Sequence, residues 1–150
     1  MMFRFIIPFF VILTHSLSAF TAELKSIEET LLDRNQNDPV TEHYLLQRCG
    51  GLYASLGIAM KNQDENEAAK TSETAMLFVM AAFELDKKIK KNVSEEQANK
   101  LITENVLQAS IFRDEYIEQM KINWTENAAL FQGSFMEDDL NYCKKLLGIN

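Results

Sequence analysis

The sequence predicts an all-α protein, a compact helical bundle of about four helices plus a short N-terminal helix. Only two prolines occur in the 150 residues, and the second is Pro39. No glycine occurs between Gly57 and Gly133. A β domain of this size would need turn residues about every 8 to 12 positions. A hydrophobic fraction of 47% also excludes a disordered chain.

Residues 1–22 have the pattern of a secretory signal peptide. Arg4 supplies a positive charge, the stretch 5–13 is apolar, and residues 14–22 are more polar with several small side chains. The apolar run is shorter than the roughly 20 residues that span a bilayer. We therefore expect cleavage after Ala19 or Ala22, no stable membrane span afterwards, and an exported protein, either periplasmic or secreted.

Residues 23–150 fit one helical domain, because their number lies within the usual range for a single domain. An amphipathic stretch over about 22–34 predicts a short first helix. Asp38 is a good N-cap and Pro39 suits the first helical turn. These two residues predict that the first long helix begins at 39 and runs to about 61.

The residues at their ends predict the second and third long helices. Asp64 and Glu65 open a second long helix, and the lysines at 87–91 close it, which complements the helix dipole. The segment 94–97 has the capping-box pattern Ser-Glu-Glu-Gln and predicts a third helix reaching about Asn123. Thr125 is expected to cap a short continuation to Gln132.

The last helix is predicted between two glycines. Gly133 ends the preceding segment, and residues 134–137 form a second capping-box pattern. Gly148 is a natural C-cap. The predicted helix therefore occupies about 134–148.

The two cysteines are expected to form one disulfide between helices. Cys49 lies on an apolar stripe of the first long helix, and Cys143 lies on an apolar stripe of the last. Both stripes must face the same core, and exported proteins meet an oxidising compartment. Two free buried thiols, packed as small hydrophobes, are the alternative. The stripes comprise Leu45, Cys49, Leu52 and Leu56, and Met136, Leu140, Cys143 and Leu147.

Two short stretches carry a resemblance to known proteins. They are Arg-Cys-Gly-Gly-Leu-Tyr at 48–53 and Asp-Leu-Asn-Tyr-Cys at 139–143. With these stretches the chain resembles small uncharacterised exported helical proteins of Gram-negative bacteria, which have an early helical cysteine and a late D-x-x-x-C. The resemblance implies a periplasmic helical protein with one disulfide, and it implies no catalytic residues.

The chemistry-bearing motifs are sparse. After the signal segment the chain has one histidine, His43, and it lacks the spaced ligands of zinc, di-iron and c-type haem sites. We therefore expect no metal or cofactor and no catalytic residue, which disfavours an enzyme. A net charge of -7 disfavours nucleic acid as a partner.

Small residues gather on one face of the first long helix. His43, Gly50, Ala54 and Gly57 fall within one arc, away from the cysteine stripe. Each internal glycine costs about 1 kcal/mol relative to alanine, so a compensating contact is expected. Tight helix packing is the favoured interpretation. A shallow slot for a flat ligand, with His43 at its end, is the alternative.

Surplus apolar residues on the second and third helices indicate an interface. A helix in a small bundle normally leaves a polar face to water. A joined apolar patch would mark an interaction surface. The candidate interface residues are Leu77, Phe78, Leu85, Leu107 and Ile111.

Three polar residues are candidates for burial. Asn105 and Arg113 project toward the apolar side of the third helix, and Asp139 lies on the last helix. A buried arginine needs a carboxylate partner, for which Asp139 is one candidate. Alternatively Arg113 lies at the stripe's edge and extends to water.

These observations rank three hypotheses. The first is an exported, non-enzymatic helical protein that binds a protein partner or another copy of itself. The second is a small-molecule carrier that uses the glycine-rich face near His43. The third, and least favoured, is an enzyme that uses Arg113 with a carboxylate.

Overall fold

Five helices make up the computed structural model, which describes residues 24–35 and 37–148. They are α1 (Ile27–Leu32), α2 (Pro39–Met60), α3 (Glu65–Lys90), α4 (Glu95–Asn127) and α5 (Phe135–Leu146). The described residues form no strand, which confirms the predicted all-α class. The predicted signal peptide, residues 1–22, lies outside the described residues.

Two helix starts form as the sequence predicts. The Asp38 side chain accepts a hydrogen bond from the backbone N–H of Val40 and caps α2. At the start of α4 the capping box is complete, because Ser94 and Gln97 each accept the other's backbone N–H. The capping residues therefore fix where α2 and α4 begin.

Two details differ from the predicted ends. The α4 helix continues past Thr125, whose hydroxyl donates to the Lys121 carbonyl at 2.9 Å instead of capping a new helix. It ends at Asn127, and the C-cap residue Ala128 has a left-handed φ of 52°. At α5 the Glu137 carboxylate accepts the N–H of Gly133, so the second predicted capping box is incomplete. A threonine inside a helix can donate its hydroxyl to a backbone carbonyl of the preceding turn, so its side chain does not cap a new helix.

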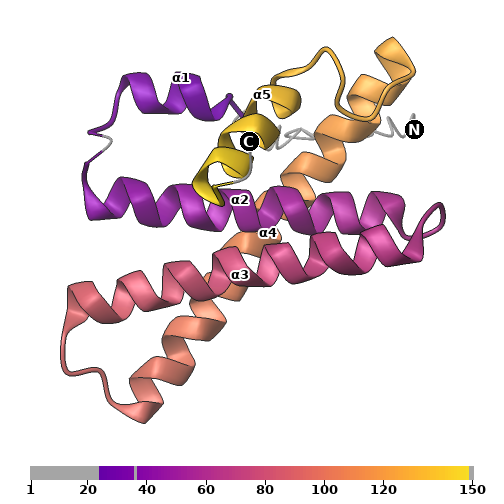
Figure 1. Cartoon of the computed structure of the whole chain (residues 1–150). Helices are drawn as coiled ribbons and strands as arrows, with labels where there is room; N and C mark the ends of the chain where they lie inside the picture. The colour runs from indigo at the N-terminus through magenta and orange to yellow at the C-terminus, as the bar shows by residue number, and fades with distance from the viewer. Residues whose placement is uncertain (1–23, 36, 149–150) are drawn as a thin grey trace, which may run out of the picture.

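The other helices pack around α2 on several sides (Figure 1). The α2 and α3 helices form an antiparallel pair, and α4 crosses them. The α1 and α5 helices lie against each other on another side of α2. More than half of the 22 residues of α2 are buried, so α2 forms the centre of the core. This arrangement is the predicted compact bundle with a short N-terminal helix.

Glycine permits the closest approach of α4 to α2. A Cβ atom at Gly51 would lie 2.4 Å from the Phe112 Cβ and 2.8 Å from the Ala109 carbonyl oxygen. At Gly57 a Cβ would lie 2.6 Å from the Ser72 hydroxyl of α3. A larger residue at Gly51 would separate α2 from α4, and one at Gly57 would displace the Ser72 side chain, so the favoured packing interpretation explains both positions.

Candidate functional site

The two cysteines form the predicted disulfide. Cys49 and Cys143 are bonded, with Cα atoms 5.6 Å apart, and both side chains are fully buried. The bond links the middle of α2 to α5 across 94 positions of sequence. It therefore fixes α5 to the central helix.

A buried ion pair lies one helical turn from the disulfide. Arg48 Nη2 donates to Asp139 Oδ2 at 2.6 Å, and neither side chain reaches solvent. Arg48 directly precedes Cys49, and Asp139 precedes Cys143 by four residues, or about one turn. The covalent bond and the ion pair thus join the same two helices side by side.

Further hydrogen bonds surround this ion pair. The Tyr116 hydroxyl of α4 accepts from Arg48 Nε at 2.8 Å and donates to Asp139 Oδ2 at 2.6 Å. The Ile27 N–H of α1 donates to Asp139 Oδ1 at 2.6 Å. The remaining Arg48 donors reach the Tyr44 hydroxyl, Thr30 and the Lys25 carbonyl. One buried cluster therefore joins α1, α2, α4 and α5.

The pKa values of two groups in the cluster, Arg48 and Tyr116, are raised. Burial disfavours the charged guanidinium, but Tyr116 and Asp139 outweigh that effect and raise the pKa of Arg48. Burial is also the main reason that the pKa of Tyr116 is raised well above its usual value. Arg48 therefore stays charged and Tyr116 stays protonated at neutral pH.

Of the three candidate buried polar residues, two lie in the core and one reaches the surface. Asn105 and Asp139 are fully buried. Arg113 is not the partner of Asp139, because its guanidinium reaches the surface and pairs with Asp114 at 2.7 Å. The alternative edge position is the correct one for Arg113. Arg48 was not among the candidates, although its spacing from Leu45 and Leu52 places it on the apolar stripe of α2.

A second polar chain crosses the bundle at the same level of α2, on another face of that helix. His43 Nε2 lies 3.0 Å from Asp86 Oδ2, which also accepts from Asn105 Nδ2 at 2.8 Å. Asn105 Oδ1 in turn accepts from Gln47 at 2.8 Å. This chain ties α2 to α3 and α4, and it accounts for His43 without a ligand.

In both polar clusters, all the buried side-chain nitrogen and oxygen atoms are hydrogen-bonded. In residues 24–35 and 37–148, every buried side-chain nitrogen and oxygen has a hydrogen-bond partner. The same residues contain no grouping of His, Cys, Asp and Glu that would hold a metal ion. A fully paired buried network makes a core rigid and specifies one arrangement of its helices.

No family model, no curated protein and no solved structure matches this chain. A candidate binding site must therefore be inferred from the surface of the protein. Within the described part of the chain, no helix has the length and apolar character needed to cross a membrane.

An apolar hollow lies where α2, α3 and α4 meet. Its volume is about 270 Å³. Gly50 and Ala54 of α2 form its floor, Met76 and Val79 come from α3, and Val106 from α4. Two of the four candidate ligand-binding residues thus line a hollow, whereas Gly57 packs on α3 and His43 pairs with Asp86.

A second apolar hollow, of about 350 Å³, lies beside the first. Ile58 of α2 lines both hollows. On α4, Val106 and Arg113 line the first hollow, and Ile117 and Trp124 line the second. These α4 positions form one stripe about 27 Å long, since 18 residues rise about 1.5 Å each. We call the two hollows together the α2–α4 groove.

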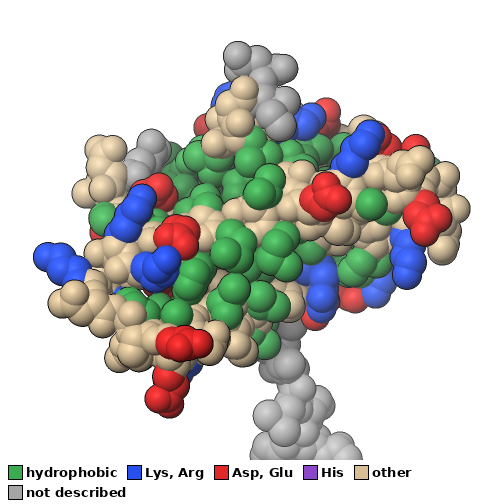
Figure 2. Space-filling view, turned by 60° about the horizontal axis from the view of Figure 1, so that its bottom comes forward, with side chains coloured by type: hydrophobic (Ala, Val, Ile, Leu, Met, Phe, Trp, Pro, Cys, Tyr) green, Lys and Arg blue, Asp and Glu red, His purple; other side chains and the backbone are tan. Residues whose placement is uncertain are grey.

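The candidate interface residues divide into surface and core. Leu77 and Leu107 are each 62% exposed, and Ile111 is also exposed. Phe78 is instead buried against Tyr53, with ring centroids 5.6 Å apart, and Leu85 is half-buried. Figure 2 shows hydrophobic side chains gathered in the middle of the face that brings α3 and the first half of α4 forward. Most charged side chains on that face lie toward its margins.

Proposed function

We propose that the protein is an exported, non-enzymatic binding module whose α2–α4 groove takes an amphipathic helix of a second protein. The observation that carries this proposal is the apolar lining shared by the two hollows through Ile58. Ile58, Met76, Val106 and Trp124 are all large apolar residues left exposed in or beside it. Methionine and tryptophan are enriched at protein interfaces.

The shape of the groove favours a helix as its occupant. A groove about 27 Å long matches about 18 residues of helix, whose apolar residues at i, i+3, i+4 and i+7 would enter the hollows. The charged residues of the lining are Arg113 and Lys121, both cationic. A partner helix with carboxylates beside its apolar stripe complements that charge. Asp114 and Glu118 are exposed partners of these cations, and such surface pairs are weak enough to exchange.

A small-molecule carrier is less well supported by the same surface. A volume of 270 Å³ lies below, and one of 350 Å³ at the small end of, the roughly 300–1,000 Å³ typical of sites that enclose a ligand. His43, the polar group expected at the end of such a slot, is held by Asp86 and does not line either hollow.

Export is part of the proposal. The pattern of residues 1–22 and a buried disulfide both favour a protein that matures outside the reducing cytoplasm. The intact mass of the protein isolated from its own host checks this point. Loss of the first 19 or 22 residues is expected, and retention of residues 1–22 would contradict it.

The groove itself is tested by the fluorescence of Trp124, the chain's single tryptophan. The probe is a synthetic helix of about 18 residues, with a leucine stripe flanked by glutamates. Binding should shift the Trp124 emission to shorter wavelength, because the exposed indole becomes covered. A scrambled peptide of the same composition should bind at least tenfold more weakly. Ile58→Asp should weaken binding of the designed helix, whereas Val40→Asp, at an exposed position in the first turn of α2, should not.

Three results would overturn the proposal. Equal emission shifts with the designed and scrambled peptides would show non-specific adsorption. A dimer in sedimentation velocity that Ile58→Asp abolishes would assign the groove to a second copy of this chain. A native mass spectrum with a small molecule retained, and released by Ala54→Trp, would instead favour the carrier function.

A further inference from the structure

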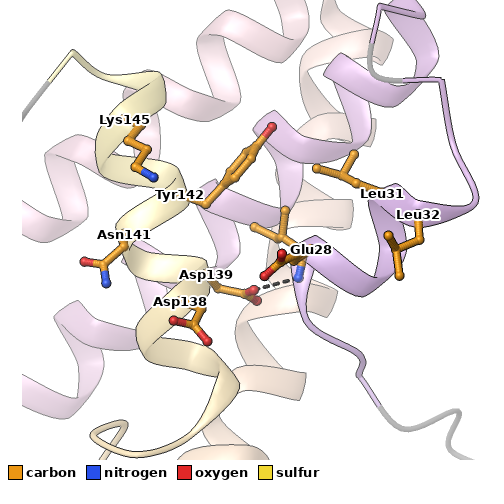
Figure 3. Close-up of a pocket in the computed structure, with 9 residues that line it drawn as sticks. Glu28, Leu31, Leu32, Asp138, Asp139, Asn141, Tyr142 and Lys145 are labelled. Atoms are coloured by element: carbon orange, nitrogen blue, oxygen red, sulfur yellow. Dashed lines mark hydrogen bonds between the residues drawn. The ribbon is translucent and has the colours of Figure 1, made fainter.

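A second concave site lies between α1 and α5, on another side of α2 from the groove. We call it the α1–α5 cleft, and its volume is about 500 Å³. Figure 3 shows Tyr142 projecting from α5 and Leu31 and Leu32 lying on α1. Its volume lies within the range of sites that take small ligands.

The charged groups of the cleft have opposite signs at its two ends. Asp138 and Lys145 both line it from α5, seven residues apart on one face of the helix. Two turns of helix separate them by about 10.5 Å. Glu28 lines it from α1. Among the described residues, Glu28, Asp138 and Lys145 take part in no ion pair.

The walls of the cleft are fixed by the buried cluster behind them. Asp139 lines the cleft and accepts the Ile27 N–H of α1 while it pairs with Arg48 of α2. Cys143 bonds α5 to the same helix. A rigid site loses less conformational freedom when it binds a ligand. The cleft is therefore prepared for binding before any ligand arrives.

From these features we infer that the α1–α5 cleft binds a short unblocked peptide with apolar side chains. The peptide's ammonium group lies between Glu28 and Asp138, and its terminal carboxylate meets Lys145. Three extended residues span about 10 Å, which matches the separation of Asp138 and Lys145 along α5. The apolar side chains pack on Leu31, Leu32 and the Tyr142 ring.

This site is independent of the proposed groove, because the two share no lining residue. The test titrates the mature, disulfide-bonded protein with the tripeptide leucyl-alanyl-leucine and follows the protein's amide signals by NMR. Saturable shifts at Leu31 and Tyr142 are expected, while the Trp124 indole signal stays unchanged. N-acetylated and C-amidated forms of the tripeptide should each bind at least fivefold more weakly.

Matched lysine variants test whether the peptide's terminal carboxylate binds at Lys145. Lys145→Met should weaken binding at least fivefold, whereas Lys144→Met, the same charge change at an exposed neighbour outside the cleft, should leave it unaltered. Asp138→Asn should weaken binding of the free peptide but not of the N-acetylated one. The inference is overturned if no saturation occurs by about 10 mM peptide. It is equally overturned if the blocked and free peptides bind alike, or if the shifts occur at Trp124 instead.

Discussion

Arg48 and Asp139 form an ion pair that water does not reach, with Nη2 and Oδ2 2.6 Å apart and side chains 0% and 1% exposed. The pair joins the central helix to a short C-terminal helix that has little core of its own. Taking two charges out of water is costly unless every donor and acceptor is satisfied. Tyr116 and the Ile27 N–H supply the missing partners for Asp139.

Removal of one partner of this pair should strongly destabilise the fold. Arg48→Met leaves Asp139 buried without its counterion, and we expect a loss of about 3 to 5 kcal/mol in the free energy of unfolding. Denaturant unfolding measures it. Arg113→Met, which removes an arginine at the surface, should change the same quantity by no more than about 0.5 kcal/mol.

The double variant separates the charge from the packing. Arg48→Met with Asp139→Leu removes both charges, so it should cost clearly less than the sum of the two single variants. Additive losses would show that the two side chains do not interact in solution.

Loss of the disulfide should lower the melting temperature without changing the helical content of the folded state. For a separation of 94 positions, the chain-entropy model gives roughly 4 to 5 kcal/mol. The Cys49→Ser, Cys143→Ser double variant is the sample, and circular dichroism against temperature is the measurement. Wild-type protein should take up no alkylating reagent before reduction. Full labelling of unreduced protein would exclude the bond.

Neighbouring glycines of α2 should respond differently to alanine. Gly51→Ala places a Cβ 2.4 Å from the Phe112 Cβ and 2.8 Å from backbone atoms of α4, so the helices must separate. We expect a loss of about 1 to 3 kcal/mol, as for other overpacked cores. Gly50→Ala meets its nearest atom, on Val79, at 3.3 Å. Its gain of about 1 kcal/mol in helix propensity should roughly offset that tight contact. Similar unfolding curves for the two variants would contradict this.

Alkaline pH should destabilise the protein through its buried tyrosines. Burial raises the pKa of Tyr116, so the native state keeps a proton that the unfolded chain loses near pH 10. This contribution to stability is complete below about pH 10 and is lost as pH rises toward the folded-state pKa. Tyr116→Phe should make the alkaline decline shallower. Tyr53 and Tyr142 also have raised pKa values from burial, so part of the slope should remain. An unchanged slope would contradict this assignment.

Sequence patterns predicted the elements well because local signals determine them. Asp38, Pro39 and the Ser94 capping box mark their helix starts in a single sequence. The disulfide followed from two apolar stripes that must share one core. These predictions depend on neighbours within one or two turns of a helix, which the sequence displays directly.

The polar clusters were harder to predict because they join distant residues. Asp139 was a candidate for burial, but its partner proved to be Arg48, 91 positions away, and not Arg113. The spacing contained a usable signal, since Arg48 adjoins Cys49 and Asp139 lies one turn from Cys143. Phe78 was assigned to the surface because helix periodicity does not say which apolar flank a neighbouring helix covers.

The groove depends on three helices meeting at angles that the sequence does not encode locally. Gly50 and Ala54 were recognised as a face of small residues, and they do form the floor of a hollow. Ile58 and Trp124 escaped notice because they lie far apart in the sequence. Only the crossing of α2 and α4 brings them to one surface.

Site-specific photo-cross-linking in the native host tests the proposed function most directly. A photoreactive amino acid replaces Ile58 in the groove or, as the control, Val40 at the start of α2, which is also apolar and exposed and lines neither proposed site. One cross-linked partner is expected from position 58 only, attached through a segment with helical apolar periodicity and flanking acidic residues. Cross-links of equal strength from both positions, or a product containing only this chain, would contradict it.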